Sequence, residues 1–139
     1  MKDFSFFVAA KAVKKQTSDI HQAKALIREG LERLDLAKSI ISSQKPKYAL
    51  ENAYEAVREC IDAVLISEGY KSYSHEASIA YLSNMGFSVS EIAAIDRMRK
   101  QRNGIKYYGE NATKEEALEA IETAKLTIPK LLQKKSQLQ

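Results

Sequence analysis

Apolar residues recur along most of the chain at the spacing of amphipathic helices. From about Ser18 to Ser43, an isoleucine or leucine returns every seven residues, and small apolar residues fill the same side. The next stretch begins at Lys45-Pro46, where proline suits a first helical turn, and ends at Gly69. Its stripe is rich in alanine, which lets a neighbouring helix approach closely. These two stretches predict two long, core-facing helices.

Capping signals mark the remaining helices. A short helix is expected from about Ser74 to Met85. Ser88-Val89-Ser90-Glu91 and Thr113-Lys114-Glu115-Glu116 are capping boxes, in which a hydroxyl residue and a glutamate three positions later satisfy each other's backbone N–H. The first box opens a helix expected to end at Asn103-Gly104, and the second opens the last helix. No stretch alternates apolar and polar residues as a strand would.

Five helices without a convincing strand predict an all-α fold, an antiparallel four- to five-helix up-down bundle. The length of 139 residues fits one domain spanning residues 1–139. Residues 1–16 are ambiguous within it. Their aromatic side chains could dock on the bundle or on a partner, while their lysines stay in water.

Composition excludes several classes of site. The single Cys60 cannot form an internal disulfide, and the two histidines, His21 and His75, are too far apart in sequence to suggest a transition-metal site. Five glycines are scattered singly, so neither a P-loop nor a dinucleotide fingerprint occurs. We therefore expect no metal and no cofactor. The free thiol and the lack of any apolar run long enough for a membrane span or a secretory signal predict a cytoplasmic protein away from membranes.

Positive charge is concentrated in one segment. The net charge of +4 favours acidic partners only weakly, because 18 carboxylates are interspersed with 22 lysines and arginines. Five cations nevertheless lie close together: Arg97, Arg99, Lys100, Arg102 and Lys106. Because Met98 and Arg102 continue the helical spacing of Ile95, Arg102 is expected on or beside the apolar stripe. Such a segment attracts phosphate.

Two adjacent tyrosines, Tyr107 and Tyr108, follow this segment and are expected in a turn at Gly109. The whole region also has an ordinary structural interpretation. Cations near a helix C-terminus are favoured by the macrodipole by about 0.3–1 kcal/mol. Tyrosines often pack their rings on a helix bundle and leave the hydroxyl in water.

The segment Arg102-Asn103-Gly104-Ile105-Lys106-Tyr107 resembles the signature of HEPN domains, in which an arginine and a polar residue are followed by three variable positions and a histidine. The order of helices over about residues 17–135 also resembles that family. The resemblance implies a homodimer whose two motifs face one cleft. For many members it further implies a metal-independent RNase, often a toxin paired with a minimal nucleotidyltransferase antitoxin.

Placed on this chain, the resemblance implies that Arg102 stabilises charge on a scissile phosphate and that Asn103 helps to position the substrate. The histidine, which would exchange protons with the ribose 2′-OH, is replaced by Tyr107. Free tyrosine has a pKa near 10 and is a poor general base near neutral pH. Binding of RNA or a nucleotide is therefore the expected function, with tyrosine rings stacking on bases and cations holding phosphates. The candidate binding residues are Arg99, Arg102, Asn103, Lys106, Tyr107 and Tyr108.

Two other functions fit the same residues. The protein could be an active metal-independent RNase of the toxin type, with Tyr107 or His75 replacing the missing base. It could instead be a non-catalytic helical adaptor that meets another helical subunit, in which case the basic segment is incidental.

Overall fold

The computed structural model describes residues 1–139. Its α-helices are α1 (Phe4–Ala9), α2 (Ile20–Ile40), α3 (Pro46–Ser67), α4 (His75–Ala80), α5 (Val89–Tyr108) and α6 (Lys114–Gln133). Short 3-10 turns follow three of them, at η1 (Ile41–Ser43), η2 (Tyr81–Met85) and η3 (Ser136–Leu138). Two strands, β1 (Val13–Lys15) and β2 (Tyr70–Ser72), complete the fold. The predicted all-α bundle is confirmed.

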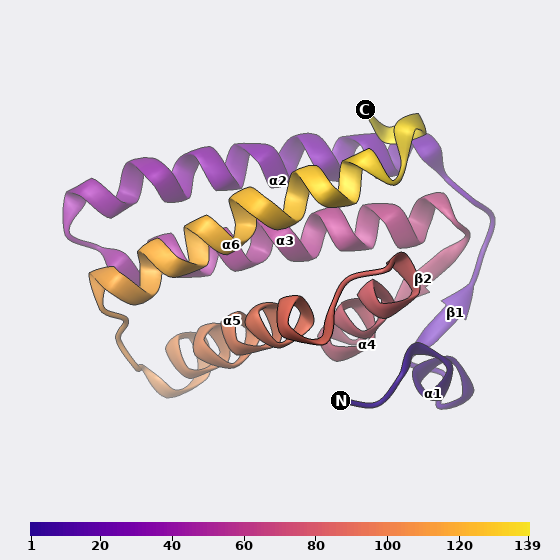
Figure 1. The fold of residues 1–139 in the computed structure, drawn as a ribbon, viewed down its shortest axis with the longest axis horizontal. Coiled ribbons are helices and arrows are strands. Elements are labelled where there is room, and N and C mark those ends of the chain that lie inside the picture. The colour runs from indigo at the N-terminus through magenta and orange to yellow at the C-terminus, as the bar shows by residue number, and fades with distance from the viewer.

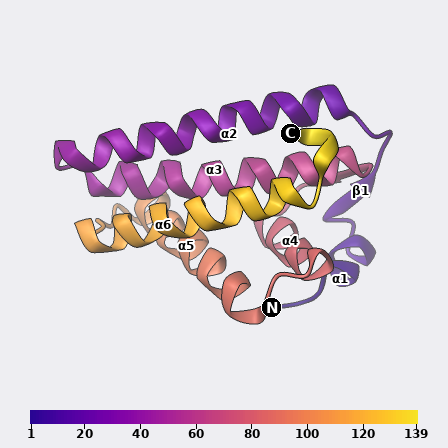
Figure 2. The ribbon, with the colours of Figure 1, turned by 45° about the horizontal axis from the view of Figure 1, so that its top comes forward.

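Helix α3 forms the centre of the bundle and packs against α2, α4, α5 and α6. Figures 1 and 2 show α2, α3 and α6 as three long neighbouring helices, with α4 and α5 on another side of α3. The alanine-rich stripe of α3 explains this position, since thirteen of its residues are buried. None of the helices combines the length and the apolar character that crossing a bilayer requires.

Helices α2 and α3 approach each other closely at Gly30. A Cβ at this position would lie 2.8 Å from Sγ of Cys60 and 3.1 Å from the backbone oxygen of Ala56. The contact therefore requires a residue without a side chain on α2. Cys60 itself is fully buried, and burial raises the pKa of its thiol to about 12. It is a core residue, as expected, and its thiol stays protonated at neutral pH.

The first 16 residues dock on the bundle. Phe4, Phe7 and Val13 are buried in the same core as the long helices, and the ring of Phe4 meets the ring of Tyr81 edge-on at 4.7 Å between centroids. The strand β1 pairs with β2 in an antiparallel sheet, with Val13 opposite Ser72. The expectation that the chain has no strand was wrong, because strands of three residues are too short to display an alternating pattern.

Helix α5 begins as expected and ends later than expected. Both predicted capping boxes are present, on α5 at Ser88 and on α6 at Thr113. However, α5 continues through Gly104 to Tyr108, and the left-handed residue that ends it is Gly109, with φ of +66°. The predicted end at Asn103-Gly104 and the predicted tyrosine turn were therefore wrong. Both tyrosines lie on the last helical turn, one turn or more beyond Arg102.

Candidate functional site

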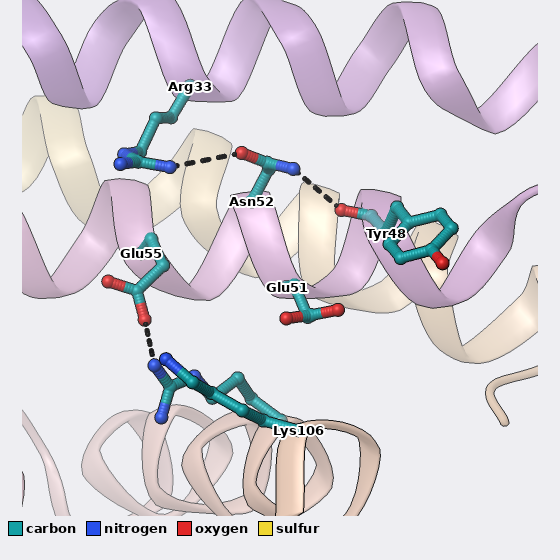
Figure 3. Close-up of a pocket in the computed structure, with 7 residues that line it drawn as sticks. Arg33, Tyr48, Glu51, Asn52, Glu55 and Lys106 are labelled. Carbon is teal, nitrogen blue, oxygen red and sulfur yellow. Dashed lines mark hydrogen bonds and ion pairs between the residues drawn. The ribbon is translucent and has the colours of Figure 1, made fainter. Parts of the chain in front are cut away.

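A cleft of about 330 Å³ lies between α2, α3 and α5. It is lined by Arg33, Tyr48, Glu51, Asn52, Glu55, Arg102 and Lys106. Figure 3 shows Arg33 and Tyr48 at opposite ends of the cleft, with the side chains of α3 and α5 facing each other between them. Two of the candidate residues named from the sequence, Arg102 and Lys106, therefore contribute to one cavity.

Arg102 is buried, with 7% of its surface exposed. Its Nη2 lies 2.9 Å from Oε1 of Glu55 on α3, and its Nη1 donates to Oδ1 of Asn103 at 3.3 Å. Its Nε has no hydrogen-bond partner. A buried guanidinium whose donors are incompletely used is costly unless another acceptor binds it. The geometry thus leaves one donor of the motif arginine unbonded, at an atom that is itself buried.

The carboxylate of Glu55 is held by two arginines. Besides its ion pair with Arg102, it accepts hydrogen bonds on Oε2 from Nε and Nη2 of Arg58, at 3.1 and 2.8 Å. Burial alone would raise the pKa of Glu55, but the hydrogen bonds and charge of Arg58, together with the charge of Arg102, lower it below the ordinary value. Arg58 also pairs with Asp62 at 2.8 Å, and Asp62 accepts from the hydroxyl of Ser78 at 2.7 Å. The ion pairs thereby tie α5 to α3, and through Ser78 to α4.

Two aromatic rings flank the motif arginine. Its Cζ lies 5.9 Å from the ring centroid of Tyr54 and 5.9 Å from that of Tyr107. Tyr54 is fully buried, whereas 64% of Tyr107 is exposed. The ammonium of Lys106 is also 5.9 Å from the Tyr107 ring. The structure therefore brings Arg102, Asn103, Lys106 and Tyr107 together.

Two of the candidate residues do not join this group. Arg99 donates to Asp96 at 2.8 Å and lies 3.7 Å from Glu76, and it does not line the cleft. Tyr108 is 79% exposed and has no aromatic or cation–π contact with Arg102. Arg99 lies one helical turn before Arg102, but Asp96 and Glu76 hold its side chain away from the cleft. Tyr108, six positions after Arg102, lies on a different face of the helix.

Most of the positive charge of this segment is already neutralised. Carboxylates lie within ion-pair distance of four of its five cations: Arg97, Arg99, Lys100 and Arg102. Lys106 is the one without a carboxylate partner. The attraction for phosphate expected across the whole segment is therefore confined to Lys106 and to the incompletely bonded Arg102.

His75 begins α4 and belongs to the same polar network, although it does not line the cleft. Its Nδ1 is 2.9 Å from the hydroxyl of Tyr54, and the two rings stack with centroids 5.8 Å apart. Burial, and then the charge of Arg58, lower the pKa of His75, so its imidazole is neutral at neutral pH. It approaches Arg102 through Tyr54 and not directly.

The sequence reasoning missed the part of the cleft formed by α2 and α3. Arg33 on α2 pairs with the buried Glu59 at 2.5 Å and donates to Asn52 at 3.3 Å. A signal for this side was present. Along the mostly buried middle of α3, charged residues follow the helical spacing of three and four: Glu55, Arg58, Glu59 and Asp62. Ionisable residues on a largely buried helix face need partners, and of these four Glu55 lines the cleft.

Residues 23–133 match the family model described as the HEPN domain. The chain belongs to the HEPN family. A search of curated proteins found no match. The matched region of this HEPN domain runs from the first turn of α2 to the end of α6 and includes every residue that lines the cleft. No group of three or more histidine, cysteine, aspartate or glutamate side chains is arranged to hold a metal ion.

Burial at Glu59 predicts a pH dependence of stability. Burial raises the pKa of Glu59 above its usual 4.5, against the opposing charge of Arg33. The folded state thus holds this proton more tightly than the unfolded chain, and ionisation of Glu59 destabilises the fold as the pH rises from about 4.5 through the folded pKa. Glu59→Gln cannot ionise. We expect its unfolding free energy to rise relative to the wild type between about pH 4 and pH 7, measured by urea denaturation. A difference that stays constant with pH would contradict this account.

Proposed function

We propose that this HEPN domain binds RNA or a nucleotide in the cleft around Arg102. Membership of the family supports a general role in RNA binding or RNA cleavage. The observation that carries the proposal is that Arg102 and Lys106, which has no carboxylate partner, line the same cleft. A phosphate oxygen is the acceptor that a guanidinium binds best, together with carboxylate.

The neighbours of Arg102 supply the other contacts that a nucleotide needs. Lys106 has no carboxylate partner and lines the same cleft, so its ammonium is available to a phosphate. Tyr107 exposes its ring beside both cations. Stacking of a base on such a ring contributes about 1–3 kcal/mol. Asn103, bonded to Arg102, helps to orient the guanidinium.

The family resemblance supports a homodimer, and we extend the proposal to a pair of facing clefts and to a minimal nucleotidyltransferase as the partner. The free thiol of Cys60 supports a reducing compartment, and we propose the cytoplasm. Sedimentation of the purified protein as a dimer is the expected result. A monomer at all concentrations would contradict the first part of this extension.

Binding without cleavage is the expected behaviour, because the position of the family's histidine holds Tyr107. Incubation of labelled RNA with the protein in EDTA, resolved for both cleavage and gel-shift, tests this directly. Cleavage that Arg102→Ala abolishes would establish a metal-independent RNase instead. If the gel shows neither cleavage nor a shift, RNA binding is refuted and the helical adaptor is favoured.

Lys106→Gln tests the cleft without disturbing its buried residues. We expect this change to weaken RNA binding about three- to tenfold and to reduce the slope of log affinity against log salt by about one, since one phosphate contact is lost. Lys100→Gln is the matched control, because it removes the same charge from the same helix at a lysine that already pairs with Asp96. Fluorescence anisotropy at several salt concentrations gives both quantities. Equal losses in the two variants, or binding that ignores salt, would contradict the proposed site.

A further inference from the structure

A second cavity of about 290 Å³ adjoins the cleft and shares Tyr48 with it. It is lined by Gln44, Lys45, Pro46, Lys47, Tyr48, Asn111 and Ala112. These residues come from the connection between α2 and α3, from the start of α3, and from the loop between α5 and α6. Figure 1 shows both connections at the same end of the bundle, away from the two chain termini.

The charge of this second cavity is entirely positive. No carboxylate lines it, and neither Lys45 nor Lys47 lies within ion-pair distance of one. The ammonium of Lys47 is 5.2 Å from the ring centroid of Tyr48, and 44% of Tyr48 is exposed. The cavity therefore combines two free cations with an aromatic surface, which is the chemistry that single-stranded nucleic acid requires.

Cationic groups in the two cavities lie on either side of the aromatic ring of Tyr48. Arg102 and Lys106 form one cationic group, Lys45 and Lys47 form another, and the ring of Tyr48 borders both cavities. Glu51 also lines the cleft on α3, and Figure 3 shows it between Glu55 and Tyr48. A carboxylate there repels a phosphate but can accept hydrogen bonds from the amino group of a base. The intervening space thus suits a base, with phosphates on either side.

We propose that the Lys45–Lys47–Tyr48 cavity is a second nucleotide subsite, which binds the part of a single RNA strand next to the nucleotide held at Arg102. The inference rests on the proposed function of the cleft. Tyr48 stacks on an unpaired base, and Lys45 and Lys47 bind the phosphate beyond it. A duplex would hide its base faces from Tyr48, so the ligand is single-stranded. An acidic peptide would supply the charge but no planar ring for stacking.

Two ligands of different length separate the subsites. The short ligand is adenosine monophosphate, followed by NMR chemical shifts, and the long ligand is a fluorescent single-stranded RNA of about eight nucleotides. We expect Lys45→Gln combined with Lys47→Gln to weaken binding of the long RNA about tenfold and to reduce its salt slope by about one, since the contact with one phosphate is lost. Binding of the monophosphate at the Arg102 cleft is expected to stay unchanged.

The matched control removes two exposed, unpaired lysines elsewhere, with Lys15→Gln and Lys24→Gln together. Equal losses in the control and the test variant would overturn the second subsite, and so would an equal loss for short and long ligands. The second subsite would also be overturned if polyglutamate displaced the long RNA as effectively as an unlabelled RNA of equal charge does. If Lys106→Gln weakens binding of the long RNA but the Lys45/Lys47 variant leaves it intact, the second subsite alone is refuted. No RNA binding by the wild type refutes the cleft and the subsite together.

Discussion

Replacing Arg102 with methionine is expected to lower the free energy of unfolding by about 3 kcal/mol, near the lower end of the cost of breaking a buried ion pair. The side chains of Arg102 and Glu55 are only 8% and 14% exposed, so water cannot replace the lost partner. Glu55 would keep Arg58 as its remaining cation, which places the loss at the low end of the range. The same variant should lose RNA binding.

Arg97→Met is the matched control for this prediction. Arg97 lies on the same helix and pairs with Glu119 at 3.6 Å, but these side chains are 60% and 70% exposed. An exposed pair contributes little, and we expect a change of about 0.5 kcal/mol or less. Chemical denaturation of both variants measures the contrast. Losses of similar size would mean that Arg102 is not part of a buried charge network.

A second change separates the ion pair from the packing of the arginine stem. Glu55→Gln removes the other partner of the same ion pair, although it also removes the carboxylate that Arg58 binds. We expect the double variant Glu55→Gln with Arg102→Met to lose less stability than the sum of the two single losses, because both single changes break the same pair. RNA binding should remain lost, since the guanidinium is absent. If the two losses simply add, the destabilisation by Arg102→Met comes from lost packing.

Gly30→Ala is expected to destabilise the protein by about 1–3 kcal/mol, the usual cost of overpacking a well-packed core. A glycine-to-alanine change inside a helix ordinarily stabilises a protein, because alanine is favoured over glycine there by about 1 kcal/mol. The effect expected at Gly30 is the opposite. At Gly30 the added methyl would meet Cys60 Sγ and the backbone of Ala56, and a backbone oxygen cannot move without shifting α3. Thermal and urea denaturation measure the loss.

Gly104→Ala provides the matched comparison within a helix. Its Cβ would overlap only the carboxylate end of Glu110, an exposed and flexible side chain that can swing away. We therefore expect Gly104→Ala to be neutral or to stabilise the protein by up to about 1 kcal/mol. Cys60→Ala should partly rescue Gly30→Ala, because it removes the sulfur that the new methyl meets. Equal effects at the two glycines, or no rescue, would refute the close α2–α3 contact.

The local signals predicted the helices well and their ends less well. Two capping boxes placed the starts of α5 and α6 because each box satisfies backbone N–H groups within a few residues, so the sequence contains the whole interaction. The end of α5 was misplaced because a glycine can continue a helix or end it. Gly104 stays helical under the side chain of Glu110, and Gly109 ends the helix.

The candidate site was predicted in part. The motif residues Arg102, Asn103, Lys106 and Tyr107 fall within six positions of one helix, and their proximity follows from helical periodicity. Arg99 was included from sequence distance alone, yet Asp96 and Glu76 hold it away from the cleft. The local sequence around Arg99 does not reveal its ion-pair partners, because Glu76 comes from another helix.

By itself, the sequence determined an all-α chain, the capped starts of two helices and a motif whose residues cluster on α5, because each of these depends on contacts within a few residues. Only the tertiary structure decided that Arg102 is buried against Glu55, that Arg33 and Tyr48 complete the cleft, and that Lys106 alone among five cations is unpaired. Burial and ion pairing depend on residues far apart in the chain, and their positions are set by how α2, α3 and α5 pack.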